Sequence, residues 1–377
     1  MTFVGTRPEI IRLSATIKLL DRAVEHCLVH TGQNYDYELN KVFFEDLQLR
    51  EPNHYLSCVG DGLGVTVGNI ISKSYDLLAD LRPDAVLILG DTNSCLAAYA
   101  AKRLQIPIFH MEAGNRCFDS RVPEEANRRV VDHLSDINLP YSQIARSYLL
   151  AEGFSPQQII VTGSPMLEVI EPYLDQIQSS TILGDLGLNS RKFFLISCHR
   201  EENIDNEQSV IKLVKLLNYL YETYDIPVLV STHPRTAKRV AEFGMKDHVS
   251  SGIIFHKPFG FIDYLSLQTN AKVVLSDSGT ITEEADILGF QAINLRESHE
   301  RPEGMEEAIV PFLGFNVDRI ADYLRYLDCE NEVGDESFSA NPKVKDYASN
   351  NVSKKVYHAI ISYVDFVNKR SYLKGIN

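Results

Sequence analysis

Three carboxylates stand at the ends of predicted strands or at the start of a predicted helix. Asp91 follows one predicted buried strand, and Glu112 follows the next strand along the chain. Glu124 lies at a predicted helix start, four residues before Arg128, so the two share one helix face. Carboxylates that lie close together have pKa values pushed apart, which allows one acid and one base near neutral pH. The three residues are therefore candidates for proton transfer.

Two of these residues also have ordinary structural explanations. Asp91 could cap the helix that follows it, because aspartate is favoured at that position. Glu124 could stand in a first helical turn only because the helix dipole favours acidic residues there. Glu112, followed directly by Ala113 and Gly114, lacks such an explanation and favours a functional role.

A second pattern is a cationic residue beside a turn that opens a helix. Arg7 follows the first predicted strand, between Gly5, which permits a tight turn, and Pro8, which suits a first helical position. Backbone amides at such a helix start, together with the arginine, bind anions. Arg12, further along the same helix, could add charge. A surface arginine in a plain strand–helix loop is the alternative.

The second half of the chain repeats this pattern at its predicted strand ends. His199 and Arg200 precede a predicted helix, and the turn Ser278-Gly279-Thr280 offers amides and hydroxyls to a phosphate. Glu284, a little over one turn later, could accept hydrogen bonds from ribose hydroxyls. Arg301 adds charge at the same end of the predicted sheet. A turn of this kind alone is a weak indication of a nucleotide site.

Composition and missing motifs narrow the chemistry. No second histidine stands at ligand spacing beside His199 or His233, and the six cysteines form no CxxC pair, so we expect no metal site. Neither a Walker motif nor GxGxxG occurs, so we expect no nicotinamide cofactor. The net charge of −14 argues against a nucleic-acid partner. No apolar run approaches the roughly 20 residues of a membrane span, and no signal peptide is visible, so we expect a cytoplasmic protein without a membrane partner.

Short apolar runs alternate with helical patterns along the whole chain. Continuous β-branched runs are typical of strands buried on both faces, and strand–helix alternation predicts a parallel sheet. Two such series predict an α/β protein with two Rossmann-like, doubly wound parallel-sheet domains and a cleft between them. The predicted strands are Thr2–Val4, His26–His30, Asp84–Leu89, Pro107–His110, Ile137–Leu139, Ile159–Val161, Phe193–Ser197, Pro227–Ser231, Ile253–Phe255, Val273–Ser276 and Ala292–Leu295.

The linker between the two series is predicted near Met166–Leu186, after a Gly-Ser-Pro turn. We therefore expect an N-terminal domain over 1–167 that carries the carboxylates, and a C-terminal, nucleotide-binding domain over 168–350. A helical pattern over 351–369 is expected to rejoin the first domain. Because ligands of open parallel sheets bind beyond the carboxyl ends of the strands, the polar clusters stand where such a ligand would lie.

Taken in order, these motifs resemble the non-hydrolysing UDP-N-acetylglucosamine 2-epimerase family. GTRPE, GDT, HMEAG, PEEANR, the strand-end HRE, SDSGTITEEA and ERPEG occur in that family's order at similar spacings through nearly the whole chain. The ordered set is highly specific, although a single member would not be. The resemblance implies a GT-B-like fold, usually dimeric, that binds a UDP-sugar without metal or nicotinamide and inverts it at C2 for cell-surface polysaccharide synthesis.

The resemblance also implies roles for individual residues. Asp91, Glu112 and Glu124 match the family's three catalytic carboxylates, and Arg128 matches the arginine that supports the last of them. His199 matches the histidine near the diphosphate and is counted with both the catalytic and the UDP-binding residues. The other UDP-binding candidates are Arg7, Arg12, Arg200, Ser278, Gly279, Thr280, Glu284 and Arg301.

Several segments depart from the family pattern. The family usually has lysine where Arg12 stands, and Thr31–Asp36 differs from a segment near the allosteric UDP-GlcNAc site of some bacterial members. Val344–Tyr347 replaces an NPYGDG-like loop. GTRPEIIRLS, HTGQNYDYELN, GFIDY, SHERPEGM and NVSxKV resemble instead the branch that forms UDP-N-acetyl-L-fucosamine. The sugar therefore stays open between UDP-GlcNAc/UDP-ManNAc and UDP-2-acetamido-2,6-dideoxy-L-talose, and a GT-B glycosyltransferase is the rival enzyme class.

Overall fold

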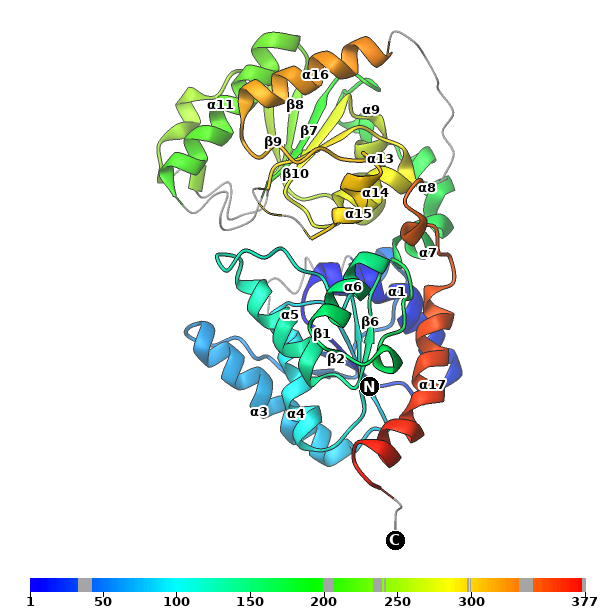
Figure 1. The fold of residues 1–377 in the computed structure, drawn as a ribbon. Coiled ribbons are helices and arrows are strands. Elements are labelled where there is room, and N and C mark those ends of the chain that lie inside the picture. The colour runs from blue at the N-terminus through cyan, green and yellow to red at the C-terminus, as the bar shows by residue number, and fades with distance from the viewer. Residues whose placement is uncertain are drawn as a thin grey trace. The chain divides into compact units, whose positions relative to one another are not determined.

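The computed structural model of the chain describes residues 1–32, 43–198, 206–232, 239–240, 242–296, 298, 300–331 and 342–374. The chain forms two compact units, Met1–Glu171 with Lys345–Asn377 and Pro172–Val344 (Figure 1). Each unit is an α/β structure built on a parallel sheet, and each is described by itself below.

The first unit contains a parallel sheet with the strand order β3-β2-β1-β4-β5-β6. Apart from the edge strand β3, its strands are short and buried, as is typical of parallel sheets covered by helices. The strand order reverses direction between β1 and β4, which is the switch point where ligands of such sheets bind. The strands are β1 (Thr2–Val4), β2 (Leu28–His30), β3 (His54–Tyr55), β4 (Val86–Leu89), β5 (Ile108–Met111) and β6 (Ile137–Leu139).

Helices cover both faces of this sheet. Helices α3, α4 and α5 pack side by side on one face, and α1 packs with α17 on the other (Figure 1). The helices are α1 (Arg7–Ala23), α3 (Leu63–Leu81), α4 (Ala97–Arg103), α5 (Pro123–Leu134), α6 (Gln143–Ala151), α7 (Met166–Ile170) and α17 (Val352–Arg370), with 3-10 turns η1 (Asn93–Leu96), η2 (Pro156–Gln158) and η5 (Lys345–Tyr347).

The second unit contains a parallel sheet with the strand order β11-β10-β7-β8-β9. Helices α11 and α16 pack together, and α13 packs with α8 and α9. Its strands are β7 (Phe194–Ser197), β8 (Val228–Ser231), β9 (Ile253–His256), β10 (Val273–Ser276) and β11 (Ala292–Asn294). Its helices are α8 (Leu174–Ser179), α9 (Ile182–Asp185), α11 (Glu207–Tyr224), α13 (Phe261–Asn270), α14 (Ile281–Leu288), α15 (Pro302–Glu306) and α16 (Val317–Asn331), with 3-10 turns η3 (Glu171–Tyr173) and η4 (Met245–His248).

The two Rossmann-like, doubly wound sheets predicted from the sequence are confirmed. Ten of the eleven predicted strands form, with ends that shift by at most two residues. The strand predicted at Ile159–Val161 is wrong, since that segment forms only an isolated bridge between Ile159 and Asn138 at the edge of the sheet. The two-residue strand β3 was not predicted, because His54–Tyr55 is too short to show an apolar pattern.

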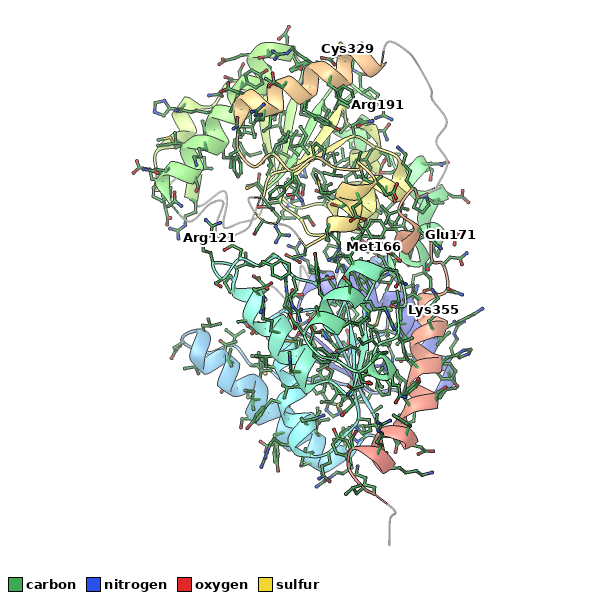
Figure 2. All side chains as sticks on the ribbon, viewed as in Figure 1. Arg121, Met166, Glu171, Arg191, Cys329 and Lys355 are labelled. Atoms are coloured by element: carbon green, nitrogen blue, oxygen red, sulfur yellow. The ribbon has the colours of Figure 1, made fainter. Side chains whose placement is uncertain are left out.

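The C-terminal segment returns to the first unit. Helix α17, which corresponds to the helical pattern over 351–369, packs against α1. Lys355, which is labelled on α17 in Figure 2, donates to the carbonyl of Thr162 at 2.7 Å. Ser353 donates to Glu168 through its backbone amide at 2.8 Å. These bonds join α17 to the segment at which the chain leaves the unit. Within the described ranges, no helix has the length and apolar character that a membrane crossing requires.

His30, at the carboxyl end of β2, makes the stability of the first unit depend on pH. Its ring is buried, and Nδ1 accepts the amide of Gly32 at 2.9 Å. Burial lowers its pKa to about 4, from an ordinary value of 6.5. Because the folded pKa lies below the unfolded value, the neutral ring stabilises the fold above pH 6.5, and this contribution is lost as the pH falls towards 4. The shift corresponds to about 3 kcal/mol.

We expect hydrogen exchange of first-unit peptides to show this loss between pH 6.5 and 4 in the wild-type chain. The loss should be much smaller in His30→Gln, because glutamine does not titrate. His358→Gln, a change of an exposed histidine on α17, is the control and should keep the wild-type pH profile. Equal pH profiles for His30→Gln and the wild-type chain would exclude this role for the buried ring.

Candidate active site

Asp91 and Glu112 lie beyond the carboxyl ends of neighbouring strands. Strands β4 and β5 pair in parallel with Leu89 opposite Met111, so the two carboxylates leave the sheet at the same edge. Gly90 turns the chain with a φ of 70°, and a Cβ at this glycine would lie 3.6 Å from a carboxylate oxygen of Glu112. The loop that carries Asp91 therefore faces Glu112.

Glu112 is held in a strained backbone conformation. Its φ of 64° is in the left-handed region, which costs a residue with a side chain on the order of 1–3 kcal/mol. Its side chain forms a buried ion pair with Arg12 of α1 and accepts a hydrogen bond from the side-chain amide of Asn115 at 3.3 Å. Its own backbone amide donates to the carbonyl of Leu139 at 3.1 Å. Strain that is fixed from several sides in this way is typical of functional residues.

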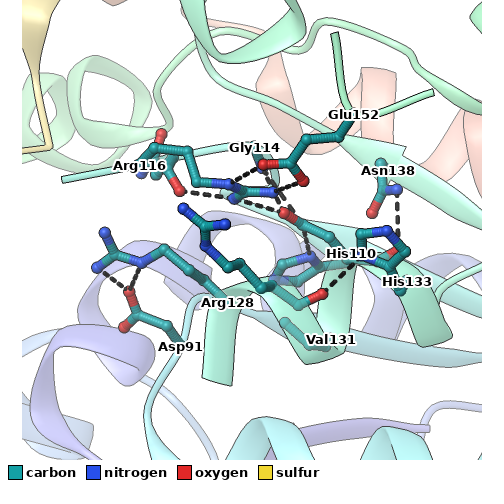
Figure 3. A network of polar contacts seen from close by, with 12 residues as sticks. Asp91, His110, Gly114, Arg116, Arg128, Val131, His133, Asn138 and Glu152 are labelled. Atoms are coloured by element: carbon teal, nitrogen blue, oxygen red, sulfur yellow. Dashed lines mark hydrogen bonds and ion pairs between the residues drawn. The ribbon is translucent and has the colours of Figure 1, made fainter. Parts of the chain in front are cut away.

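Asp91 is held by an arginine from helix α5. Arg128 donates to one oxygen of Asp91 through Nε at 3.0 Å and through Nη2 at 2.6 Å (Figure 3). Asn127 adds a bond to the Asp91 carbonyl at 2.9 Å. Helix α5 thus fixes both the side chain and the backbone of Asp91.

The predicted support of Glu124 by Arg128 is not what this helix shows. Within the described part of the chain, Arg128 pairs with Asp91 and Glu125, the latter at 3.2 Å. Glu125 is buried, whereas Glu124 is half-buried. The i,i+4 spacing was correct for one helix face, but the neighbouring β4 loop brings a second carboxylate that sequence spacing does not reveal. Glu124 remains at the first turn of α5, near the site but outside this ion-pair network.

Arg12 and Arg7, both predicted to bind substrate, lie in different surroundings. Arg12 is buried against Glu112, with its guanidinium 5.9 Å from the ring centre of Tyr141, so its charge is directed to the carboxylate. Arg7 opens α1, is only half-buried, and stacks 5.6 Å above the ring of Phe43. Of the two, Arg7 has the more exposed position, as an anion contact at this helix start would require.

Glu9 joins the α1 turn to the β4 loop. One of its oxygens accepts the amides of Gly5 and Thr6, both at 2.7 Å, and the other accepts the hydroxyl of Thr92 at 2.8 Å. A further bond comes from the hydroxyl of Ser94. Burial raises the pKa of Glu9, against the opposing effect of these hydrogen bonds. The residue thereby sets the spacing between the turn with Arg7 and the loop with Asp91.

Because the folded pKa of Glu9 is raised above its usual 4.5, its contribution to stability is present below that pH and is lost as the pH rises through the folded pKa. Glutamine at this position can accept the two amides with its oxygen and donate to the two hydroxyls. We therefore expect Glu9→Gln to gain stability relative to the wild-type chain as the pH rises from 4.5 to 8, measured by hydrogen exchange of first-unit peptides. Glu25→Gln, at an exposed position, should show no such trend, and a constant difference for Glu9→Gln would contradict the assignment.

In the second unit, the turn Ser278-Gly279-Thr280 leads directly into α14. The hydroxyls of Ser278 and Thr280 lie 2.9 Å apart, and the Ser278 amide donates to the hydroxyl of Ser276 at 3.0 Å. All three turn residues are partly exposed, while every residue of α14 is buried. A partly exposed turn at the start of a buried helix has the geometry of a phosphate-binding turn.

Glu284 on α14 is supported from the neighbouring helix. Gln268 of α13 donates to Glu284 at 2.8 Å, and both side chains are buried. Burial, followed by the negative charge of Glu284, raises the pKa of Tyr264, so its hydroxyl stays neutral. Arg301 is also buried and pairs with Glu283 at 3.3 Å, so it anchors the loop after β11 to α14. These contacts place Glu284 and Arg301 at α14, the helix that follows the turn Ser278-Gly279-Thr280.

His199 and Arg200 lie outside the described residues. Their predicted roles stay predictions. Among the residues that the structure describes, no group of three or more histidine, cysteine or acidic side chains could hold a metal ion.

Sequence reasoning missed the residues that support this site. Glu9 and Asn127 belong to motifs that were recognised, but no role was assigned to them. The sequence indicated them only because each is a polar residue, without a packing function, inside a recognised motif. Gln268 and Asp132 gave no such signal, because each stands within an amphipathic helix and contacts the site only through the tertiary fold.

Comparison with known proteins identifies the family. A family model described as UDP-N-acetylglucosamine 2-epimerase matches residues 18–361. The UDP-N-acetylglucosamine 2-epimerase of Methanocaldococcus jannaschii is 35% identical over 331 residues, which cover 84% of this chain and 88% of that protein. The solved structure of UDP-N-acetylglucosamine 2-epimerase from Rickettsia bellii is 45% identical, covers 99% of both chains and gives a TM-score of 0.90.

A crystal structure of the M. jannaschii enzyme in complex with UDP-GlcNAc and UDP is 31% identical, covers 96% of this chain and 99% of that one, and gives a TM-score of 0.86. Fold and sequence similarity thus place the chain in a class of two-sheet α/β epimerases. The chain belongs to the UDP-N-acetylglucosamine 2-epimerase family. The family resemblance predicted from the ordered motifs is confirmed.

Proposed function

We propose that the protein interconverts UDP-N-acetylglucosamine and UDP-N-acetylmannosamine by removing UDP and adding it back. The observation that carries the proposal is the pair Asp91 and Glu112, which leave adjacent strands at one sheet edge, each fixed by a buried arginine. A binding protein for nucleotide sugars would have no use for two carboxylates positioned at this cost in strain and buried charge.

The proposed reaction starts with loss of UDP, because no carbonyl acidifies the proton at C2. The C1–O bond to UDP breaks while a base takes the C2 proton, and the C2–H electron pair forms the C1=C2 double bond of a glycal. A proton then returns to C2 on the opposite face, and UDP attacks C1 again. The overall process consumes no water and no oxidant, and both substrate and product carry UDP.

Individual residues have separate roles in the proposed reaction. Asp91 and Glu112 transfer the protons on the two faces of C2, a role worth about 10²–10⁴-fold in rate. Glu124, at the first turn of α5, supports or shares this role. Arg7, the turn Ser278-Gly279-Thr280, and His199 with Arg200 stabilise the departing diphosphate, and Glu284 holds the ribose.

A second candidate for the sugar of the substrate also has support. The segments GTRPEIIRLS, GFIDY and SHERPEGM resemble the branch whose substrate is UDP-2-acetamido-2,6-dideoxy-L-talose. This sugar undergoes the same inversion at C2, so the proton-transfer residues would be unchanged. The two candidates differ in the configuration of ring carbons, since one is a D-sugar and the other an L-sugar, and at C6, which is deoxy in the second. The described residues of the site give no contact that discriminates between them.

NMR of the purified protein in D₂O, with UDP-GlcNAc and with the 6-deoxy-L-talo substrate in separate samples, tests the proposal. We expect the second epimer to appear with one deuterium at C2 and with UDP again bound at C1, without net release of free UDP. A glycosyltransferase would introduce no deuterium at C2, whether or not an acceptor is present. A hydrolysing epimerase would accumulate free UDP and free sugar, and either result would reject the proposed reaction.

We further propose a homodimer. Helix α3 buries only Ile70, Ser74 and Leu78, while apolar side chains along it stay exposed, such as Leu63 at 67% and Val65 at 53%. Such a surface is typical of a subunit contact. Sedimentation analysis should give a dimer for the wild-type chain and a monomer for Val65→Lys, and a monomeric wild-type chain would contradict the proposal.

A further inference from the structure

Three buried side chains and a fourth that is 25% exposed form a network behind the two strand-end turns. His110, Arg116 and Asp132 are buried, and Glu152 of the α6 C-cap completes the network at its outer end (Figure 3). None of the four belongs to the residues proposed for proton transfer or UDP binding. Burying two basic and two acidic groups in this way costs desolvation free energy, which suggests that their arrangement has a function.

His110 holds the turn that presents Asp91. It stands in β5, and its ring nitrogen Nε2 lies 3.0 Å from the carbonyl oxygen of Gly90. Because a carbonyl only accepts hydrogen bonds, Nε2 carries a hydrogen and donates it. Gly90 directly precedes Asp91 and has a φ of 70°, so this bond fixes the tight turn through which Asp91 leaves the sheet.

The other ring nitrogen leads to the turn that presents Glu112. Nδ1 of His110 lies 2.9 Å from Asp132, and both oxygens of Asp132 accept the amide of Gly114 at 3.2 Å. Gly114 has a φ of 78°, and a Cβ there would lie 2.5 Å from the carbonyl of Ala145. The backbone after Glu112 is therefore fixed between Asp132 and α6.

Arg116 closes the network around Asp132. Its Nη1 donates to Asp132 at 2.8 Å and to the carbonyl of Asn115 at 2.7 Å. Glu152 holds the opposite side of the guanidinium with two bonds of 2.8 and 2.6 Å. Since Asn115 itself contacts Glu112, the network reaches the strained glutamate along two routes.

We propose that His110 is a positioning residue that sets Asp91 and Glu112 together, one through each nitrogen of its ring. The inference rests on the proposed function, because it assumes that these two carboxylates transfer the C2 proton. A strained residue such as Glu112 keeps its conformation only when its surroundings over-determine it. A displacement of about 1 Å at a reacting group costs on the order of 10²-fold in rate. His110 thus couples the geometry of both faces of the sugar.

Two variants separate the two contacts. The side-chain amide of His110→Gln reaches the Nε2 position and can keep the bond to Gly90, whereas that of His110→Asn reaches the Nδ1 position and can keep the bond to Asp132. We expect each variant to lower kcat about 10-fold and His110→Ala to lower it about 100-fold. KM for the UDP-sugar should stay within about twofold, since the UDP contacts in the second unit are untouched.

Turnover is expressed per folded molecule, with the folded fraction taken from hydrogen exchange and UDP affinity from calorimetry. A fall in kcat at unchanged UDP affinity supports the proposal. Unchanged kcat per folded molecule in His110→Ala, or a rise in KM with kcat unchanged, would overturn it while leaving the proposed reaction intact. A wild-type chain that puts no deuterium at C2 of either candidate sugar would reject the proposed function, and this inference with it.

Discussion

Glu112→Gln and Asp91→Asn are each expected to lower the rate of epimerisation by about 10²–10⁴-fold. Both changes keep the size of the side chain and remove its ability to take or return a proton. Glu112 and Asp91 leave neighbouring strands, and each is fixed by its own arginine, so neither side chain can easily take the place of the other. The rate is measured as conversion of UDP-GlcNAc followed by NMR.

The labelling pattern in D₂O distinguishes the two residues. If one carboxylate serves each face of C2, a variant that lacks one base can still form the glycal from one of the two epimers. The glycal is then protonated again on the same face, so deuterium enters C2 without inversion. We expect Glu112→Gln to show this exchange from one epimer, and Asp91→Asn to show it from the other.

Asp136→Asn provides the matched control. Asp136 is a buried carboxylate of the same unit, but it precedes β6 and binds the amide of Ile108 at 3.0 Å, at the amino ends of the strands. Its loss should leave turnover within about twofold of the wild-type rate. Near-wild-type turnover in both Glu112→Gln and Asp91→Asn would remove these residues from the mechanism.

The fold was predictable because its signals are local. Runs such as Val86–Leu89 and Val273–Ser276 are continuous, β-branched and bounded by turns, so strand, helix and strand order follow from neighbouring residues. The edge segment at Ile159–Val161 carries the same signal but pairs with only one neighbour, and its bridge to Asn138 is too short to count as a strand. The local apolar pattern of a segment does not indicate how many neighbouring strands it pairs with.

The candidate site was predictable only in part. Asp91 and Glu112 stand at neighbouring strand ends of one sheet, where topology alone brings side chains together, and the turn at Ser278 stands at a strand end of the other sheet. Which arginine holds which carboxylate depends on the packing of helices that are distant in sequence. Arg12 reaches Glu112 across 100 residues, and Arg128 turns to Asp91 rather than to Glu124 on its own helix. Ion pairs of this kind follow from the tertiary fold, and spacing along one helix cannot reveal them.

Arg128→Met is expected to destabilise the first unit by about 3 kcal/mol and to lower turnover by about 10²-fold. Methionine has a similar length but no charge, so Asp91 loses both of its bonds from Nε and Nη2, and buried Glu125 loses one ion pair. Removing one partner of a buried ion pair lowers stability by more than the intact pair contributes, because the remaining charge stays buried without compensation. Arg128→Lys keeps the charge but loses the two-bond geometry, and should give intermediate values.

Arg129→Met is the matched control for this change. Arg129 binds the same Glu125 at 2.9 Å from the next position of α5, but its side chain is 47% exposed. Exposed ion pairs contribute at most about 1 kcal/mol, so Arg129→Met should change stability little and leave turnover unaffected. Because the chain has two units, stability is measured by hydrogen exchange of first-unit peptides, which reports on this unit separately.

A double-mutant cycle shows whether the effect passes through Asp91. If it does, Arg128→Met made in the Asp91→Asn background should cost about 2 kcal/mol less than in the wild-type chain, because position 91 then carries no charge for Arg128 to pair with. Equal costs in the two backgrounds would show that Arg128 acts through Glu125 and helix packing instead. In that case the arginine stabilises α5, and the orientation of Asp91 must come from the hydrogen bond between Asn127 and its backbone, together with the hold of His110 on Gly90.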